Sequence, residues 1–119
     1  KTIKLPVSAP FHCSLMSNAT IIMREELDKL TFQNSGKKLI SNVTSEPILH
    51  FEELKNLLIK QIENRVRWRE SVINMIKNGI THFIEIGPGK VLSGLVKRIN
   101  RDVKIDTINN QEDIINLKL

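Results

Sequence analysis

Apolar residues recur at helical spacing in several stretches of this chain. Over residues 14–30 they fall three or four positions apart, which predicts an amphipathic helix. Its buried side is expected to carry Met16, Ala19, Met23, Leu27 and Leu30. Similar spacing predicts helices over residues 50–64, 67–78 and 90–101, and a last turn or two over 110–117. Each of these helices needs a partner for its apolar face.

Between the helical stretches lie short runs that are typical of strands. Residues 1–7, 38–44 and 103–107 are strand-like, and residues 81–86 form a mostly apolar run of the kind buried in parallel sheets. Strands that alternate with helices predict an α/β layered architecture. The chain has no internal repeat and no long linker. We therefore expect one domain, or a piece of a larger one.

The composition is that of an ordinary globular chain, with 40% hydrophobic and 26% charged residues among 119. Cys13 is the only cysteine, so no disulfide can form within the chain, which is typical of a reducing compartment. The apolar runs are far shorter than the roughly 20 residues that a membrane span needs. These features predict a cytoplasmic protein without a membrane partner.

The formal net charge is +5, and the lysines are dispersed along the chain. A dispersed excess is usually a solvated surface, and the functional alternative is an acidic partner. Aromatic residues make up only 4% of the chain and tyrosine is absent. The chain therefore lacks the stacking platform of single-stranded nucleic-acid binders, and nucleic-acid binding is the weaker alternative.

His12 is the first candidate for chemistry. It lies in an expected loop between Pro10 and the start of a helix, where an imidazole can be fixed and can reach a cleft to shuttle protons. A lone histidine is more often structural than catalytic, and this position gives the structural and the catalytic interpretation about equal weight. Cys13 is expected to be a small packing residue. His50 and His82 lack ligand spacing, so we expect no zinc site.

Two amide side chains need partners. Gln61 falls on or beside the apolar stripe of its predicted helix, so its amide should find a hydrogen-bond partner, either at the surface or near a polar cleft. Asn42 lies in a strand-like segment, where it either ties down a neighbouring loop or marks a sheet edge. Both residues are therefore candidates for a site.

The segment Gly87-Pro88-Gly89-Lys90 superficially resembles a nucleotide-binding loop. Val91 follows the lysine where a Walker loop has Ser or Thr, and Leu92 stands where a dinucleotide fingerprint has glycine. The segment instead predicts a tight turn from a strand into a helix, which can still line a cleft.

Four segments, in order, resemble one enzyme family. The stretch VSAPFHCSLM at residues 7–16 resembles the catalytic-histidine segment of malonyl-CoA:acyl carrier protein transacylases, and residues 85–95 resemble the glycine-rich turn and helix near their C-terminus. Between them, residues 40–43, and Gln61 followed by residues 66–72, fit the family in order and approximate spacing. The resemblance covers nearly the whole chain.

The resemblance implies an α/β fold of a particular kind. The family has an α/β-hydrolase-like acyltransferase core with an inserted ferredoxin-like subdomain. Residues 1–7 would be the last strand of that small subdomain, and residues 8–119 the C-terminal part of the core. The chain, which opens at Lys1 on a strand already under way, would then be a single partial domain from the later part of a longer protein.

The resemblance also implies an S-malonyltransferase of fatty acid biosynthesis. In the family a serine attacks the thioester of malonyl-CoA, a histidine takes its proton as general base, and the acyl group passes to the phosphopantetheine thiol of the acyl carrier protein. His12 matches that histidine, and Gln61 matches a glutamine whose backbone carbonyl orients the imidazole. Malonyl-CoA and the carrier protein are substrates, and no further cofactor is implied.

Four other residues are candidates for roles beside this pair. Asn42 is a candidate for substrate binding, and Lys90, Lys97 and Arg98 are candidates for contact with an acidic carrier protein. The chain contains no Gly-x-Ser-x-Gly segment, so it would hold the general base without its nucleophile. We therefore expect the isolated chain to be inactive. The alternative is a non-catalytic split-gene remnant or module that only binds a partner.

Overall fold

The computed structural model describes residues 8–34 and 36–117, which belong to two compact units divided between Trp68 and Arg69. The strand expected over residues 1–7 lies outside the described residues. The described part contains both helices and strands, and the expected α/β class is confirmed. None of the described helices is long and apolar enough to cross a membrane.

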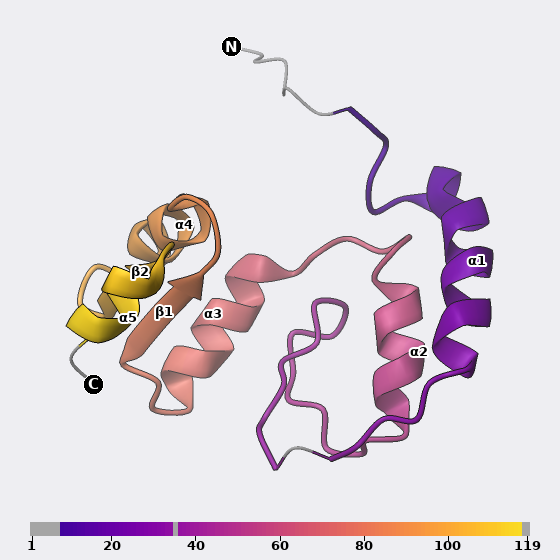
Figure 1. The fold of residues 1–119 in the computed structure, drawn as a ribbon, viewed down its shortest axis with the longest axis horizontal. Helices are drawn as coiled ribbons and strands as arrows, with labels where there is room; N and C mark the ends of the chain where they lie inside the picture. Colours follow the sequence, from indigo (N-terminus) through magenta and orange to yellow (C-terminus); the bar gives the residue numbers. More distant parts are fainter. Residues whose placement is uncertain (1–7, 35, 118–119) are drawn as a thin grey trace. The chain divides into compact units, whose positions relative to one another are not determined.

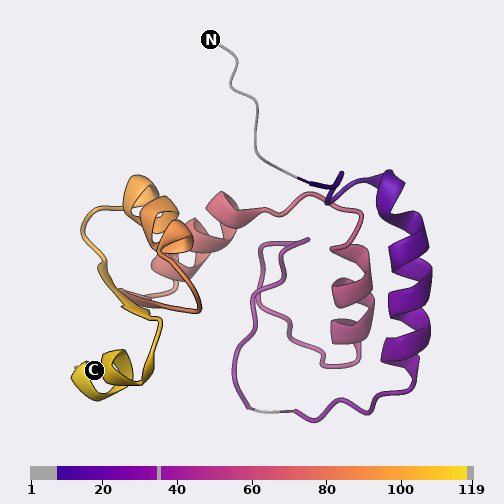
Figure 2. The same ribbon diagram turned by 45° about the horizontal axis from the view of Figure 1, so that its top comes forward.

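The first unit is built around two helices. A single 3-10 turn, η1 (Ser14–Met16), leads into α1 (Ser17–Asp28), and a long loop connects α1 to α2 (Glu53–Lys60). The two α-helices lie side by side in Figure 1 and in Figure 2. Leu54 and Ile59 of α2 are buried and form the apolar core of this unit.

The apolar stripe predicted for α1 is only partly buried. Met16, Ala19 and Leu27 are half-buried, but Met23 and Leu30 are 44% and 56% exposed. The reason is that α2 is the one helix of this unit that packs on α1 among the described residues. The remaining apolar surface of α1 therefore faces outward.

The prediction of a strand over residues 38–44 is wrong. Its backbone makes a single antiparallel bridge between Ile40 and Pro47 and then turns back at residues 42–44. The buried Ser41 hydroxyl accepts hydrogen bonds from the amides of Val43 and Thr44, at 3.1 and 3.3 Å. A side chain that binds its own downstream amides competes with strand pairing, so the segment becomes a turn.

The second helix is shorter than the apolar spacing predicts. It ends at Lys60, and Gln61 is its C-cap residue, with helical φ −64° and ψ −19°. Residues 61–63 continue as hydrogen-bonded turns instead of a further turn of helix. Gln61 therefore stands at the carboxyl end of α2, where backbone carbonyls have no partner within the helix.

The second unit alternates helix and strand as expected. It contains α3 (Trp68–Lys77) apart from its first residue, β1 (His82–Ile86), α4 (Val91–Ile99), β2 (Lys104–Ile108) and α5 (Gln111–Asn116). The strands β1 and β2 are parallel, from His82 opposite Lys104 to Ile86 opposite Ile108, and α4 is the crossover between them (Figure 1). The buried apolar residues of the second unit are Val72, Val96 and Val103.

The predicted turn between β1 and α4 is confirmed, and its own groups close the helix end. Gly87 and Gly89 take φ +138° and +93°, a backbone conformation that favours glycine. The Glu85 carboxylate accepts hydrogen bonds from the amides of Leu92 and Ser93, at 3.0 and 2.7 Å. A carboxylate already satisfies the first turn of α4, so a phosphate there would meet a like charge.

This cap generates a pH prediction. Hydrogen bonding by Ser93, whose amide donates at 2.7 Å, and by the Leu92 amide lowers the pKa of Glu85 below its ordinary value of 4.5. The stabilisation is therefore present above pH 4.5 and is lost as the pH falls through the lower pKa of the folded state. In Glu85→Gln we expect a lower unfolding midpoint at neutral pH and a shallower loss on acidification, measured by thermal unfolding across the pH range.

The control is Glu25→Gln, because Glu25 is exposed on α1 and caps no helix end. It should leave the pH profile of stability as in the unaltered chain. Parallel profiles for Glu85→Gln and the unaltered chain would contradict the assignment of this cap.

Candidate active site

His12 projects from a tight loop just before η1. Its φ is +60°, a left-handed conformation that costs an ordinary residue about 1–3 kcal/mol and persists only where the surroundings hold it. Two bonds tighten this loop: the Phe11 amide donates to Ala9 O at 2.9 Å, and the Cys13 thiol donates to Pro10 O at 3.1 Å. The imidazole is thus presented on an exposed but constrained backbone.

The imidazole is held by a residue 49 positions further along the chain. His12 Nδ1 lies 2.8 Å from the backbone carbonyl oxygen of Gln61. A carbonyl oxygen can only accept, so Nδ1 carries the proton and donates it. The neutral ring then has its lone pair on Nε2. A fixed imidazole with a free Nε2 can take a proton from a hydroxyl or thiol brought within hydrogen-bond reach.

The carbonyl that receives this bond lies at the carboxyl end of α2. Carbonyls of a last helical turn lack intrahelical partners and form the negative end of the helix dipole. His12 supplies a donor to one of them, so the contact satisfies both groups. The site therefore joins the loop before η1 to the end of α2.

Asn42 lies next to this pair. Its side-chain Nδ2 donates to Gln61 Oε1 at 2.9 Å, and its backbone carbonyl accepts from the Arg67 amide at 2.9 Å. The two amide side chains that the sequence leaves in need of partners are thus partners of each other. A hollow of about 250 Å³ beside them is otherwise lined mainly by apolar side chains, including Ile40 and Leu57.

The other histidines have different surroundings. His82 Nε2 lies 2.7 Å from Asp106 Oδ2 across β1 and β2, and Lys104 Nζ lies 3.5 Å from the same oxygen. The His82 ring, helped by the Lys104 charge, lowers the pKa of Asp106. His50 is exposed in the loop before α2. No cluster of three or more His, Cys, Asp or Glu side chains that could hold a metal ion occurs among residues 8–34 and 36–117.

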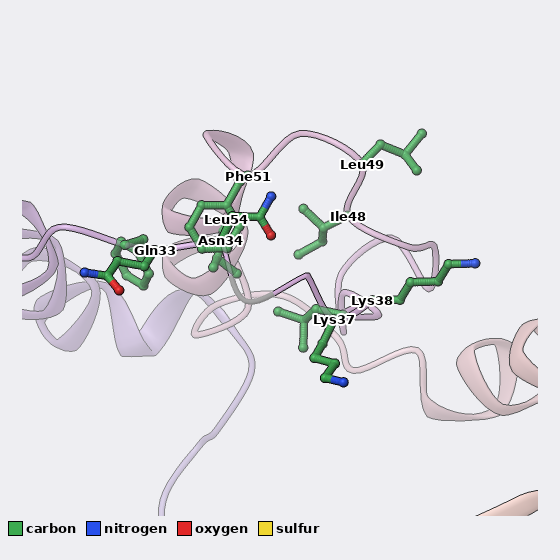
Figure 3. Close-up of a pocket in the computed structure, with 10 residues that line it drawn as sticks. Gln33, Asn34, Lys37, Lys38, Ile48, Leu49, Phe51 and Leu54 are labelled. Atoms are coloured by element: carbon green, nitrogen blue, oxygen red, sulfur yellow. The ribbon is translucent and has the colours of Figure 1, made fainter.

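A larger hollow of about 340 Å³ in the first unit does not involve His12 (Figure 3). Its apolar lining includes Phe51 and Leu54, and Lys37 and Lys38 stand at one side with their ammonium groups directed away from Phe51. Gln61 and Asn42 do not line it. This hollow is therefore separate from the imidazole.

The three cationic candidates belong to the second unit. Lys90 is the N-cap residue of α4, and Lys97 and Arg98 lie in its last turn. Lys97 Nζ donates to the carbonyl of Arg101 at 2.8 Å, so part of its hydrogen-bonding capacity is used locally. All three are exposed.

Sequence reasoning missed two features of the molecule. One is the bond between Asn42 and Gln61, for which the only signal is that both amides stand in otherwise apolar patterns. The other is the Glu85 cap, for which the signal is a carboxylate at the end of an apolar strand, just before a glycine-rich turn.

Known proteins match almost the whole chain. Malonyl CoA-acyl carrier protein transacylase of Bacillus subtilis is 42% identical over 114 residues, which are 96% of this chain but 36% of that protein. The chain thus spans about a third of the length of the curated relatives it matches. No protein-family model matches the chain.

Solved structures agree with this result. The crystal structure of malonyl CoA-acyl carrier protein transacylase from Clostridium perfringens superposes with a TM-score of 0.87 at 38% identity, over 96% of this chain and 36% of that one. A malonyl-transacylase solved in complex with its type II PKS acyl-carrier protein superposes with a TM-score of 0.84 at 33% identity, over 93% of this chain and 36% of that one.

These shares are consistent with a C-terminal fragment, as the four sequence motifs predict. The recognition from sequence is confirmed: by sequence and by fold, this chain is a homologue of part of malonyl CoA-acyl carrier protein transacylase.

Proposed function

We propose that this chain is the general-base part of an S-malonyltransferase that moves malonyl groups from malonyl-CoA to an acyl carrier protein. The observation that carries the proposal is the 2.8 Å contact between His12 Nδ1 and the Gln61 carbonyl, on an exposed loop. The names of the relatives supply the reaction, and His12 and Gln61 supply a base and the group that orients it.

In this proposal His12 moves one proton back and forth. Its Nε2 takes the proton of a serine hydroxyl as that oxygen attacks the thioester carbon of malonyl-CoA. The C–S bond breaks, and Nε2 returns the proton to the departing thiolate. The phosphopantetheine thiol of the carrier then gives its proton to Nε2, its sulfur attacks the malonyl-serine ester, and the serine oxygen recovers the proton.

Gln61 acts in place of a triad carboxylate. Its carbonyl oxygen holds the proton on Nδ1, which leaves Nε2 free to act, and its partial negative charge favours the imidazolium that forms while the proton is in transit. Because this carbonyl is uncharged, no ionised group has to be buried to orient the imidazole. The serine itself must come from outside these 119 residues, which contain no Gly-x-Ser-x-Gly segment.

We also propose that the chain is one partial domain of an α/β-hydrolase-like core, with residues 1–7 as the last strand of a small inserted subdomain. Large apolar side chains remain exposed in both units, among them Leu15 at 75%, Ile86 at 79% and Val91 at 71%. Within the described residues β1 and β2 pair only with each other. Parallel sheets are normally covered on both faces, so the exposed apolar surface favours a larger core. The proposed location of the protein is the cytoplasm.

The proposed protein partner is the acyl carrier protein. A relative of similar fold was solved in complex with such a carrier, which supports the same class of partner for this chain. Lys90 is the N-cap residue of α4, Lys97 and Arg98 lie in the last turn of the same helix, and all three side chains are exposed. This arrangement suits an acidic partner.

The role of His12 is tested in two settings. The isolated chain should transfer no malonyl group above background. A chimera in which this chain replaces the matching segment of the Bacillus subtilis relative should transfer malonyl from malonyl-CoA to carrier protein. His12→Ala should reduce kcat of the chimera by about 10²–10⁴-fold, the usual contribution of a general base.

His50→Ala in the same chimera is the matched control, because His50 is an exposed loop histidine with no contact to Gln61 in the structure. It should leave kcat unchanged. A chimera that folds and turns over equally well with His12→Ala would refute the proposed base. Turnover by the isolated chain that disappears in His12→Ala would refute the missing-nucleophile reading.

The carrier contact is tested in the same chimera by reversing charges. Lys90→Glu and Arg98→Glu should raise KM for the carrier protein and reduce its salt dependence, while KM for malonyl-CoA stays unchanged. Lys77→Glu, at the end of α3, is the control. If all three variants alter KM for the carrier equally, the effect is one of net charge and the proposed surface is wrong.

A further inference from the structure

Asn42 contacts both ends of the segment that follows α2. Its side chain donates to Gln61 Oε1, and its carbonyl accepts from the Arg67 amide, each at 2.9 Å. The segment between these two residues contains turns and no regular secondary structure. One residue from a distant loop therefore fixes both the start and the end of this irregular stretch.

Asn42 is itself held by a tightly bonded turn. The Ser41 amide donates to Glu46 O at 3.0 Å, and the Ser45 amide donates to Ser41 O at 2.8 Å. The Ser41 hydroxyl accepts from two further amides of the turn, and Ser41 and Ser45 are both buried. Asn42 is thus a fixed point to which Gln61 is attached.

The end of a helix is where its backbone frays most readily. The Gln61 carbonyl that binds His12 points in a direction set only by the backbone of that residue, since its side chain is not part of the contact. Any rotation of the peptide plane after Gln61 would move the oxygen away from His12 Nδ1. Anchoring the side chain of the same residue opposes this rotation.

We propose that Asn42 is a positioning residue: it fixes Gln61, and through the Gln61 carbonyl it fixes the tautomer of His12. This inference rests on the proposed role of His12 as the base. It gives Asn42 a role beside the substrate binding expected from the sequence, because the Asn42 amide nitrogen is directed at Gln61. The adjoining hollow is largely apolar, and in such surroundings a bond between two amides is stronger than in water.

The chemistry of the two amides provides a test by charge. Asn42→Asp keeps the link, because the Gln61 amide can rotate and donate its NH₂ to the new carboxylate. Gln61→Glu also keeps it, because Asn42 Nδ2 can donate to the carboxylate. The double variant has two carboxylates and no donor, so at neutral pH the link is broken and the groups repel each other.

The measurement is the tautomer of His12 in the full chain, read by NMR from long-range proton–nitrogen correlations of ¹⁵N-labelled imidazole while the ring is neutral. We expect the Nδ1–H form to dominate in the unaltered chain and in both single variants. In the double variant the ratio of Nδ1–H to Nε2–H should fall about fivefold, the effect of losing one ordinary hydrogen bond.

Alanine variants keep the inference testable if the double variant does not fold. Asn42→Ala and Gln61→Ala should lower the tautomer ratio equally, and together no further, because each removes the same link. Asn64→Ala is the control: Asn64 Nδ2 donates to Lys60 O at 2.7 Å in the same segment but does not contact Gln61 or His12 in the structure. It should leave the ratio unchanged.

An unchanged ratio in both Asn42→Ala and the folded double variant overturns the inference, and so does an equal fall in Asn64→Ala. These results do not depend on turnover. A tautomer that follows Asn42 in a chain whose chimera is inactive supports the positioning and refutes the proposed function. An active chimera in which the tautomer ratio does not respond to Asn42 supports the proposed function and refutes the positioning role.

Discussion

The site depends on one bond, from His12 Nδ1 to the carbonyl of Gln61. Without it the imidazole would stand on an exposed loop, free to rotate and to exchange its proton between two nitrogens. The loop alone cannot prevent this, because its internal bonds fix the backbone and not the ring. The left-handed φ of His12 is the backbone strain accepted to bring the ring against the end of α2.

A carbonyl at this position has consequences that a carboxylate would not have. It selects the tautomer without adding a permanent charge. The carboxyl end of the α2 dipole is negative, like the carbonyl oxygen, so the two act on the imidazole in the same direction. Its direction, however, is set entirely by the backbone at the end of a short helix. A side-chain carboxylate can be oriented by its own rotamer, whereas a carbonyl must be oriented by whatever holds its residue. The turn at residues 41–45 meets this requirement through Asn42.

Periodicity and strand-like runs predict most of the second unit, because its helices and strands carry clear apolar patterns that the sheet and α4 bury. They fail at residues 38–44, where composition favours a strand but the hydroxyl of Ser41 binds its own downstream amides. They also extend α2 too far, since apolar spacing continues to Ile62 while the hydrogen bonds change to turns. Resemblance to the family predicts the pairing of His12 with Gln61. The link from Asn42 depends on a turn geometry that no local pattern encodes.

The two helix ends of interest differ in what closes them. The first turn of α4 is closed by Glu85, a charged group that leaves no amide of Leu92 or Ser93 free for an anion. The last turn of α2 is closed by His12, a group that keeps a second nitrogen free after it has satisfied the helix. Closure by a carboxylate uses up the chemistry of the helix end, whereas closure by an imidazole creates a base there. The proposed base of this chain therefore lies at the end of α2.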